Sequence, residues 1–266
     1  MRPYLFQVGD TGIPTYWVLV MIGFAAAIYF VWKESRRDGL DPNPLLDLCL
    51  ILMVCAIVGA RLMHVLAEED PLAPGRPILY RYLEHPGEAL RVWNGLAFFG
   101  GFLLCLPAAW IYLGLRRLPR GEVFDLFGAA IPLGIFFGRL GCFFAGCCHG
   151  KPTDLPWGVA FSDLHSLAAP LGQPLHPTQL YEALFGLALF FLMWFQKRAW
   201  RRFPGQVFLS FAALYSAGRF LLEFLRADNR GMHFGGLLSS SQIVAIGVFV
   251  PAVIALAWLD RRRRAA

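Results

Sequence analysis

The last apolar stretch of the chain reads GLLSSSQIVAIGVFVPAVIALAWL (residues 236–259), and four arginines follow it at residues 261–264. It carries no charged side chain and reaches the roughly 20 residues that an α-helix needs to cross the hydrocarbon core of a bilayer. Two more uncharged runs, Tyr16–Trp32 and Gly95–Leu115, have a similar length. These stretches predict an all-α integral membrane protein.

Four further apolar runs carry only a few charges each, which brings the prediction to seven transmembrane helices. These runs are Pro44–Leu66, Val123–Phe144, Leu180–Gln196 and Gly205–Leu225. The composition agrees, because 57% of the 266 residues are apolar and 16% are charged. Soluble domains average about 45–50% and about 25%. A disordered chain, a collagen-like chain and an ordinary nucleic-acid-binding domain are thereby excluded.

The basic residues predict how the helices are oriented. They gather after spans one, three, five and seven, at Lys33, Arg36, Arg37, Arg116, Arg117, Arg120, Lys197, Arg198, Arg201, Arg202 and Arg261–Arg264. Loops rich in Lys and Arg stay in the cytoplasm, so we expect the N-terminus outside and the C-terminus inside. The net charge of +6 is then an orientation signal, and no nucleic-acid partner is expected. Residues 1–266 are predicted to form a single transmembrane domain.

Function is predicted on the outer face, where two long loops fall at about residues 68–94 and 147–178. Charges inside the spans point the same way. Arg61, Arg139 and Arg219 each cost about 2.5–3.5 kcal/mol at mid-bilayer, and Glu223 cannot neutralise all three. Structural ion pairs are one interpretation. The other is an anionic ligand, since the arginine fork fits phosphate oxygens and the abundant phosphate in a membrane is a phospholipid headgroup.

Arg219, Glu223 and Arg226 stand at positions i, i+4 and i+7. That spacing places all three on one face of a helix. We therefore expect Glu223 to aim Arg219 or Arg226 at the ligand.

Three thiols and one imidazole follow within the run Gly138–Gly150, at Cys142, Cys147, Cys148 and His149. Four interpretations remain open: a zinc site, although the spacing is not the usual one; a disulfide such as Cys142 with Cys147; catalysis by Cys147 or His149; and plain packing in a glycine-rich turn. Glycines at 134, 138 and 141 allow a helix or a lipid to approach closely.

The motif His176-Pro177-Thr178-Gln179-Leu180-Tyr181-Glu182 leads into the fifth span. Its proline and threonine predict a helix start at which Thr178 caps free N–H groups. Its polar residues either form a plain helix entry at the membrane interface or line a polar cavity.

Taken in order, these motifs resemble the prolipoprotein diacylglyceryl transferase family of the bacterial inner membrane, over nearly the whole chain. The matching elements are Gly59-Ala60-Arg61, Arg91-Val92-Trp93-Asn94-Gly95 with Gly100-Gly101, Gly138-Arg139-Leu140-Gly141, the motif from His176 to Glu182, the set Arg219, Glu223 and Arg226, and Gln242. The resemblance adds signature positions to the candidate site: Gly138, Gly141, Cys142, Gly146, His176, Gln179, Tyr181 and Glu182.

The chain also departs from the family pattern. The signature has two asparagines and a glutamate where this chain reads Cys142, Ala145 and Cys147, and Phe99 replaces a histidine that is a candidate base. A tyrosine expected in the first span is Val20. The phosphate-binding arginines carry over, whereas the proton-transfer residues do not.

The resemblance implies transfer of a diacylglyceryl group from phosphatidylglycerol to the lipobox cysteine thiol of a prolipoprotein signal peptide. This is the first step of bacterial lipoprotein modification, and it needs no metal or other cofactor. Arg139, Arg219, Arg61 and Arg226 are the predicted phosphate-binding residues. Arg219 and Glu223 are also predicted catalytic residues, and Glu223 is expected to orient Arg219.

Because Phe99 cannot act as a base, His149 is the first candidate, ahead of His64 and His176. Cys147 is a candidate transient lipid carrier. Two other functions remain open: a membrane transferase that uses the same lipid with another acceptor, and a non-enzymatic protein that binds lipid, or metal through its thiols.

Overall fold

The computed structural model describes residues 3–8, 11–67, 69–70, 73–89, 98–227, 231–233 and 235–265. The predicted motif Arg91–Gly95 lies outside these residues. The chain divides into two compact units: unit 1 holds residues 1–34 and 121–266, and unit 2 holds residues 35–120. Each unit is described by itself, and the single domain expected from the sequence stays a prediction.

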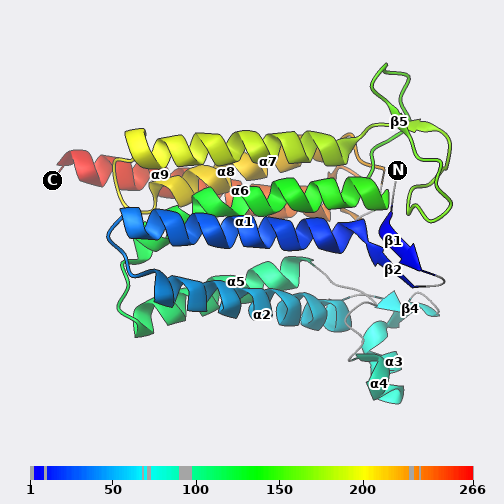
Figure 1. Cartoon of the computed structure of the whole chain (residues 1–266), viewed down its shortest axis with the longest axis horizontal. Coiled ribbons are helices and arrows are strands. Elements are labelled where there is room, and N and C mark those ends of the chain that lie inside the picture. Colours follow the sequence, from blue (N-terminus) through cyan, green and yellow to red (C-terminus); the bar gives the residue numbers. More distant parts are fainter. Residues whose placement is uncertain are drawn as a thin grey trace. The chain divides into compact units, whose positions relative to one another are not determined.

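Unit 1 is built from long helices that run alongside one another (Figure 1). They are α1 (Thr15–Arg37, whose last residues belong to unit 2), α6 (Arg120–Ala145), α7 (Thr178–Phe195), α8 (Gln206–Glu223) and α9 (Ser240–Ala265). A π-helical turn, η2 (Gln196–Trp200), extends α7. Helix α8 packs chiefly on α9 and also on α7.

Short antiparallel hairpins complete unit 1. They pair β1 (Tyr4–Val8) with β2 (Thr11–Pro14), β5 (Val159–Ala160) with β6 (Pro174–Leu175), and β7 (Met232–His233) with β8 (Leu238–Ser239). Strands β1, β2 and β5 lie at the end of the unit away from the C-terminus (Figure 1).

Unit 2 contains α2 (Pro42–Ala67), β3 (Glu69–Asp70), β4 (Ala73–Pro77), α3 (Ile78–Glu84), α4 (Pro86–Ala89) and α5 (Phe98–Leu115). Helices α2 and α5 pack on each other, with the backbones of Gly59 and Gly100 in close contact. A Cβ at either glycine would collide with the carbonyl oxygen of the other. Two glycine motifs of the sequence therefore serve one close helix crossing, as is common between membrane helices.

A helix occupies each of the seven segments that the sequence predicts as spans. Among the described residues, five of these helices are long and apolar enough to cross a membrane: those over 15–37, 42–66, 120–145, 178–200 and 240–265. The apolar helix Gly100–Leu115 is shorter, and α8 is not among the five. The protein is therefore a largely helical membrane protein.

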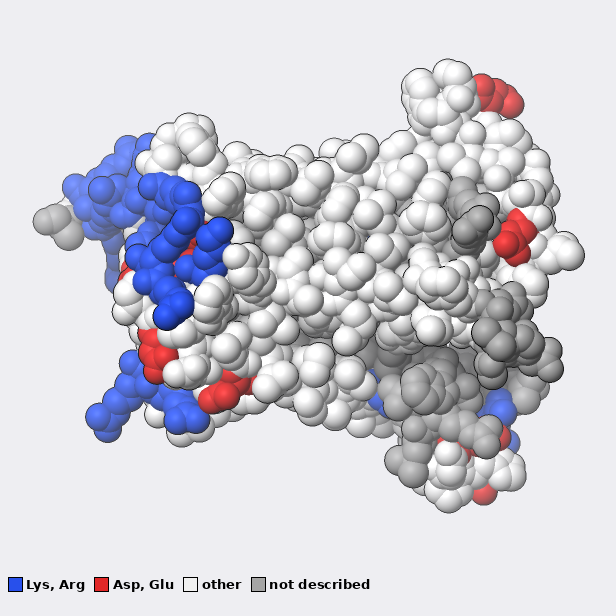
Figure 2. Space-filling view, in the orientation of Figure 1, with Lys and Arg blue, Asp and Glu red and all other residues white. Residues whose placement is uncertain are grey.

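Many exposed Lys and Arg side chains of unit 1 lie where the C-terminus lies. Figure 2 shows Lys and Arg side chains massed there, beside a broad uncharged surface over the middle of the helices. At this end Arg202 reaches Asp260, with an N–O distance of 3.6 Å. Arg201 pairs with Glu122 at the start of α6. Basic residues from distant parts of the sequence thus meet at one end of the unit.

Asp125 explains how an acid is accommodated in the apolar run of α6. Its carboxylate is fully buried and accepts hydrogen bonds from the backbone N–H groups of Gly205, Val207 and Phe208, at 2.9, 2.7 and 3.1 Å. These N–H groups belong to the start of α8, where the first turn lacks partners within the helix. Asp125 therefore caps a neighbouring helix.

Candidate functional site

Three helices of unit 1, α6, α7 and α8, and the segment after α8 bring buried charges together at the end opposite Asp125. We call Arg139, Glu182, Arg219, Glu223 and Arg226 the arginine cluster. Glu182 lies at its centre: its carboxylate is 2.7 Å from Arg139 Nε, 3.4 Å from Arg219 Nε and 3.7 Å from an Nη atom of Arg226. One carboxylate is thus shared by three guanidinium groups.

The cluster is shielded from solvent, so its interactions are stronger than in water. The side chains of Glu182 and Arg226 are each 1% exposed, and that of Arg219 is 11% exposed. Arg139 is the most open member at 19%. These arginines therefore lie at a partly covered site.

Glu223 holds Arg219 as the spacing predicts. Its carboxylate lies 2.7 Å from an Nη atom of Arg219 and accepts a hydrogen bond of 2.8 Å from the Ser239 hydroxyl. Gln242 in turn accepts a hydrogen bond from the Ser239 backbone N–H at 2.9 Å, which fixes the start of α9. Glu223 is thus held by Ser239, the last residue of β8 directly before α9, while it orients Arg219.

The arginine cluster still has unused hydrogen-bond donors. Among the described residues, Arg139 forms its ion pair through Nε, and its two Nη groups have no ion-pair partner. The buried Nη1 of Arg219 has no hydrogen-bond partner within the same part of the chain. Buried donors of this kind are normally satisfied. An anion bound beside Arg139 and Arg219 would satisfy them.

One expectation about this cluster is corrected. Helix α8 ends at Glu223, so Arg226 does not share a helical face with Arg219 and Glu223. It lies in the segment after α8 that pairs with Gly150, and tertiary packing turns it toward Glu182. The sequence suggested that Glu223 could not neutralise the arginines alone, and Glu182 adds a second buried acid to the three guanidinium groups of the cluster.

Arg61 belongs to unit 2 and contacts that unit. A guanidinium nitrogen donates to the backbone oxygen of Glu88 at 3.0 Å, and the group lies 5.0 Å from the ring centre of Tyr82. Its assignment to phosphate binding stays a prediction.

The motif from His176 to Glu182 leads into the first turn of α7. It contacts the turn after α6 that contains Cys147 and Cys148. Thr178 and Gln179 are fully buried. The expected cap by Thr178 is wrong, because its hydroxyl donates to the Cys148 carbonyl at 2.8 Å instead of accepting a helix N–H. Gln179 donates to the Cys147 carbonyl at 2.8 Å. This motif therefore anchors the turn that follows α6.

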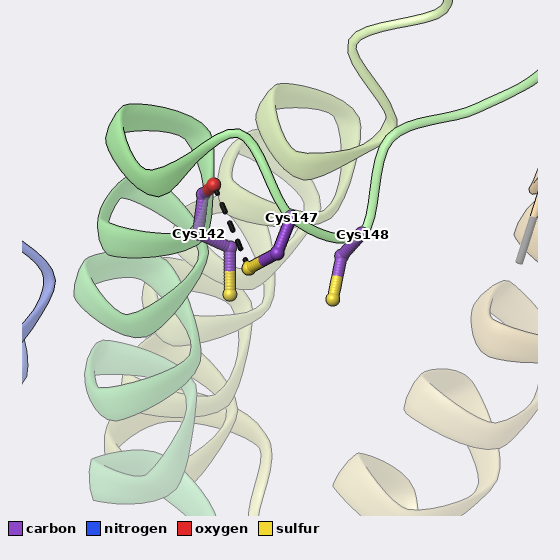
Figure 3. Close-up of side chains that lie close together, drawn as sticks. All are labelled: Cys142, Cys147 and Cys148. Carbon is purple, nitrogen blue, oxygen red and sulfur yellow. Dashed lines mark hydrogen bonds between the residues drawn. The ribbon is translucent and has the colours of Figure 1, made fainter. Parts of the chain in front are cut away.

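The clustered cysteines converge in that turn. We call Cys142, Cys147 and Cys148 the cysteine triad. Their Sγ atoms all lie within 4.8 Å of one another, and Figure 3 shows Cys147 and Cys148 on the segment that turns back beside Cys142 at the end of α6. All three are free thiols, and the Cys147 thiol donates to the Cys142 carbonyl at 3.8 Å.

The two thiols beyond α6 differ in acidity. The neighbouring Cys142 and Cys147 thiols, together with Arg139 and Arg226, hold the pKa of Cys148 well below its usual range. The same neighbouring thiols, together with burial, raise the pKa of Cys147.

Both ring nitrogens of His149 contact the backbone. Nδ1 lies 3.0 Å from the Gly150 carbonyl, to which it donates, and Nε2 accepts from the Ala169 N–H at 3.3 Å. His149 therefore joins two parts of the loop. His176 lies 3.4 Å from the Tyr181 hydroxyl, which also accepts a 2.8 Å hydrogen bond from the Trp157 indole.

The signature glycines serve different purposes. A Cβ at Gly141 would come 3.0 Å from the Tyr16 ring, so α6 approaches α1 closely there. Gly146 has φ of 77°, in the left-handed region that suits glycine, and a side chain there would collide with Ser166. A Cβ at Gly134 or Gly138 would meet no described atom within 4 Å, so the close helix packing expected at these two positions is not seen.

Comparisons with known proteins identify the family. The family model for prolipoprotein diacylglyceryl transferase matches residues 3–258. The chain belongs to this family. A phosphatidylglycerol–prolipoprotein diacylglyceryl transferase from Cupriavidus metallidurans is 34% identical, with 98% of this chain and 94% of that protein covered.

Two further proteins with that name have similar identities. The one from Solidesulfovibrio magneticus is 33% identical, covering 98% of this chain and 94% of its own length. The one from Clostridium tetani is 31% identical, covering 94% and 96%. The resemblance predicted from the motifs is confirmed, and with it the prediction of a diacylglyceryl transferase.

Of the residues predicted for this transferase site, the structure brings Arg139, Arg219, Glu223 and Arg226 together. Sequence reasoning missed the central role of Glu182 and the support from Ser239. The signal for Glu182 was an acid inside an apolar run. Ser239 had none, because only the packing of α9 on α8 brings it to Glu223.

Proposed function

We propose that the chain transfers the diacylglyceryl group of phosphatidylglycerol to the lipobox cysteine of prolipoprotein signal peptides, and that Arg139, Arg219 and Arg226 hold the phosphate. One observation carries this proposal: a buried arginine cluster shares one central carboxylate and leaves donors of Arg139 and Arg219 unused. Those donors match a phosphate, which arginine binds through paired hydrogen bonds.

The reaction places its greatest electrostatic demand on that phosphate. The acceptor thiolate forms a bond to the terminal glyceryl carbon, and the bond from this carbon to the phosphate oxygen breaks. The electron pair leaves with glycerol phosphate, whose charge changes from one negative to two. Fixed arginines stabilise the second charge more than the first, and an interaction that is stronger in the transition state accelerates the reaction.

Glu182 and Glu223 act as positioning residues in this scheme. Glu182 holds the three guanidinium groups at one place, and Glu223 orients Arg219. Because these contacts exist before substrate binds, little reorganisation is needed during the reaction.

The chemistry also bears on the predicted carrier. A lipid attached to Cys147 would be a thioether, and a second thiol would then have to displace an unactivated thiolate from carbon. Direct transfer to the acceptor avoids that step, and we leave Cys147 out of the mechanism. His149 as general base stays a prediction, since both of its ring nitrogens contact the backbone.

The proposed location is the bacterial inner membrane, with seven spans, the N-terminus outside and the C-terminus in the cytoplasm. The basic end of unit 1 supports this orientation. Glu122 pairs with Arg201 at that end, and Arg139 stands about 25 Å further along α6 at 1.5 Å per residue. The arginine cluster would then lie toward the outer side, as expected.

The deciding experiment incubates purified protein with phosphatidylglycerol and a lipobox peptide under reducing conditions, and measures the peptide mass. A diacylglyceryl increment on the peptide cysteine is expected. Its absence, beside a working enzyme of the same family, would shift the proposal to another acceptor. Arg202→Ala is the matched control, because its guanidinium is exposed in the same unit.

A further inference from the structure

The cysteine triad lies outside the proposed reaction, yet its arrangement is specific. Its Sγ atoms lie within 4.8 Å of one another, and each residue is partly shielded from solvent. In a tetrahedral site with Zn–S bonds of about 2.3 Å, neighbouring sulfurs stand about 3.8 Å apart. Small side-chain movements therefore bring all three sulfurs to bonding distance of one ion.

The backbone is shaped to present the third thiol. Cys148 has φ of 63°, a value that side-chain-bearing residues rarely adopt. Thr178 and Gln179 hold this conformation by hydrogen bonds to the carbonyls of Cys148 and Cys147, each at 2.8 Å. Costly conformations of this kind concentrate at functional sites.

Positively charged groups also lie near the triad. Arg139 stands one helical turn before Cys142 and interacts with both Cys142 and Cys148, and Arg226 interacts with Cys148. A divalent ion bound by three thiolates has a net charge of −1, which neighbouring guanidinium groups stabilise.

We propose that Cys142, Cys147 and Cys148 form a binding site for one thiophilic d10 cation, with Zn²⁺ as the first probe. Thiolate ligands select Zn²⁺ and Cu⁺ over harder ions. The three sulfurs supply three ligands and leave a fourth position for water, as in zinc sites that have three protein ligands. The spacing of the cysteines did not indicate this, because the usual pairs of zinc ligands are absent.

A disulfide is the competing arrangement. It would join two of the three sulfurs and leave the third unused, whereas the turn directs all three to one place (Figure 3). The proposal does not depend on the transferase reaction, and its test involves no lipid transfer.

The test titrates the purified, reduced, tag-free protein with Zn²⁺ in competition with a chromophoric chelator. One tightly bound ion per chain is expected. Adding Cd²⁺ instead should produce the ultraviolet absorption of cadmium–thiolate bonds. Cys142→Ser, Cys147→Ser and Cys148→Ser should each weaken zinc binding at least tenfold and reduce the cadmium absorption.

The matched control replaces the three cysteines of unit 2, Cys49, Cys55 and Cys105, by serine in one variant. It should bind zinc and cadmium like the unmodified protein. The cadmium spectrum of the unmodified protein needs no variant, so a variant that fails to fold does not obscure the result. Equal zinc affinity of the unmodified protein and the three triad variants would overturn the proposal. So would a disulfide within the triad that forms equally fast in excess zinc.

Discussion

Buried carboxylates have different partners at the two ends of unit 1. At one end, Asp125 is fully buried and each carboxylate oxygen accepts backbone N–H groups at the start of α8. At the other end, Glu182 is equally buried but is shared by three guanidinium groups, and donors remain unused. The first arrangement is closed and stabilises the fold. The second is open to an anion.

The physical difference lies in the partners. Backbone N–H groups at a helix start are fixed by the helix, so a carboxylate that reaches them completes a structural cap. Guanidinium groups have five donors each, more than one shared carboxylate can accept. An end at which three arginines surround Glu182, with Glu223 as the second acid, therefore keeps capacity for a ligand.

The largest effect is expected from Glu182→Ala, which removes the shared anion. Three buried arginines would then lose their common partner, and breaking a buried ion pair in this way costs about 3–5 kcal/mol. The melting temperature of the detergent-solubilised protein measures the loss. Inorganic phosphate should restore part of it by occupying the vacated place, and a melting temperature equal to that of the unmodified protein would contradict the central role of Glu182.

Arg139→Ala should leave the fold largely intact and reduce transfer to the lipobox peptide by about 10²–10³-fold, the usual effect of losing one donor to a developing charge. Arg139→Lys should recover only part of the activity, since lysine lacks the paired donors. The peptide assay checks both against Arg202→Ala. If Arg139→Ala and Arg202→Ala had equal activity, the phosphate site would be misplaced.

Asp125→Ala tests the closed end and should separate stability from activity. Loss of the cap is expected to destabilise the protein by about 0.5–2 kcal/mol. The activity per folded molecule should stay unchanged, because Asp125 lies far from the arginine cluster along α6. A lowered melting temperature with full activity supports the contrast between the two ends. An unchanged melting temperature with reduced activity would contradict it.

The smallest effect is expected at His149, which joins two parts of the loop after α6. If His149 only joins Gly150 and Ala169, His149→Gln should keep most of the activity and the pH dependence of the unmodified enzyme. If it is the general base, His149→Gln and His149→Ala should both lose activity and the alkaline limb of the pH profile should change. Full profiles of the two variants distinguish these roles.

The sequence allowed a large part of this architecture to be predicted, because lipid imposes simple rules on it. Apolar length predicts membrane helices, and a helix is found in every predicted segment. An arginine in such a helix needs a partner, and this reasoning predicted the pair of Arg219 with Glu223 that the structure contains. Local spacing failed where the helix ended: α8 stops at Glu223, before Arg226.

By itself, the sequence determined the helical membrane class, the family, and the arginine and cysteine residues around which a site could form. These depend on composition and on neighbours within a few residues. Only the tertiary structure decided that Glu182 lies among three arginines, that Thr178 holds the cysteine turn, and that the three sulfurs meet. Such contacts join residues far apart in the chain, and their distances depend on how the helices pack.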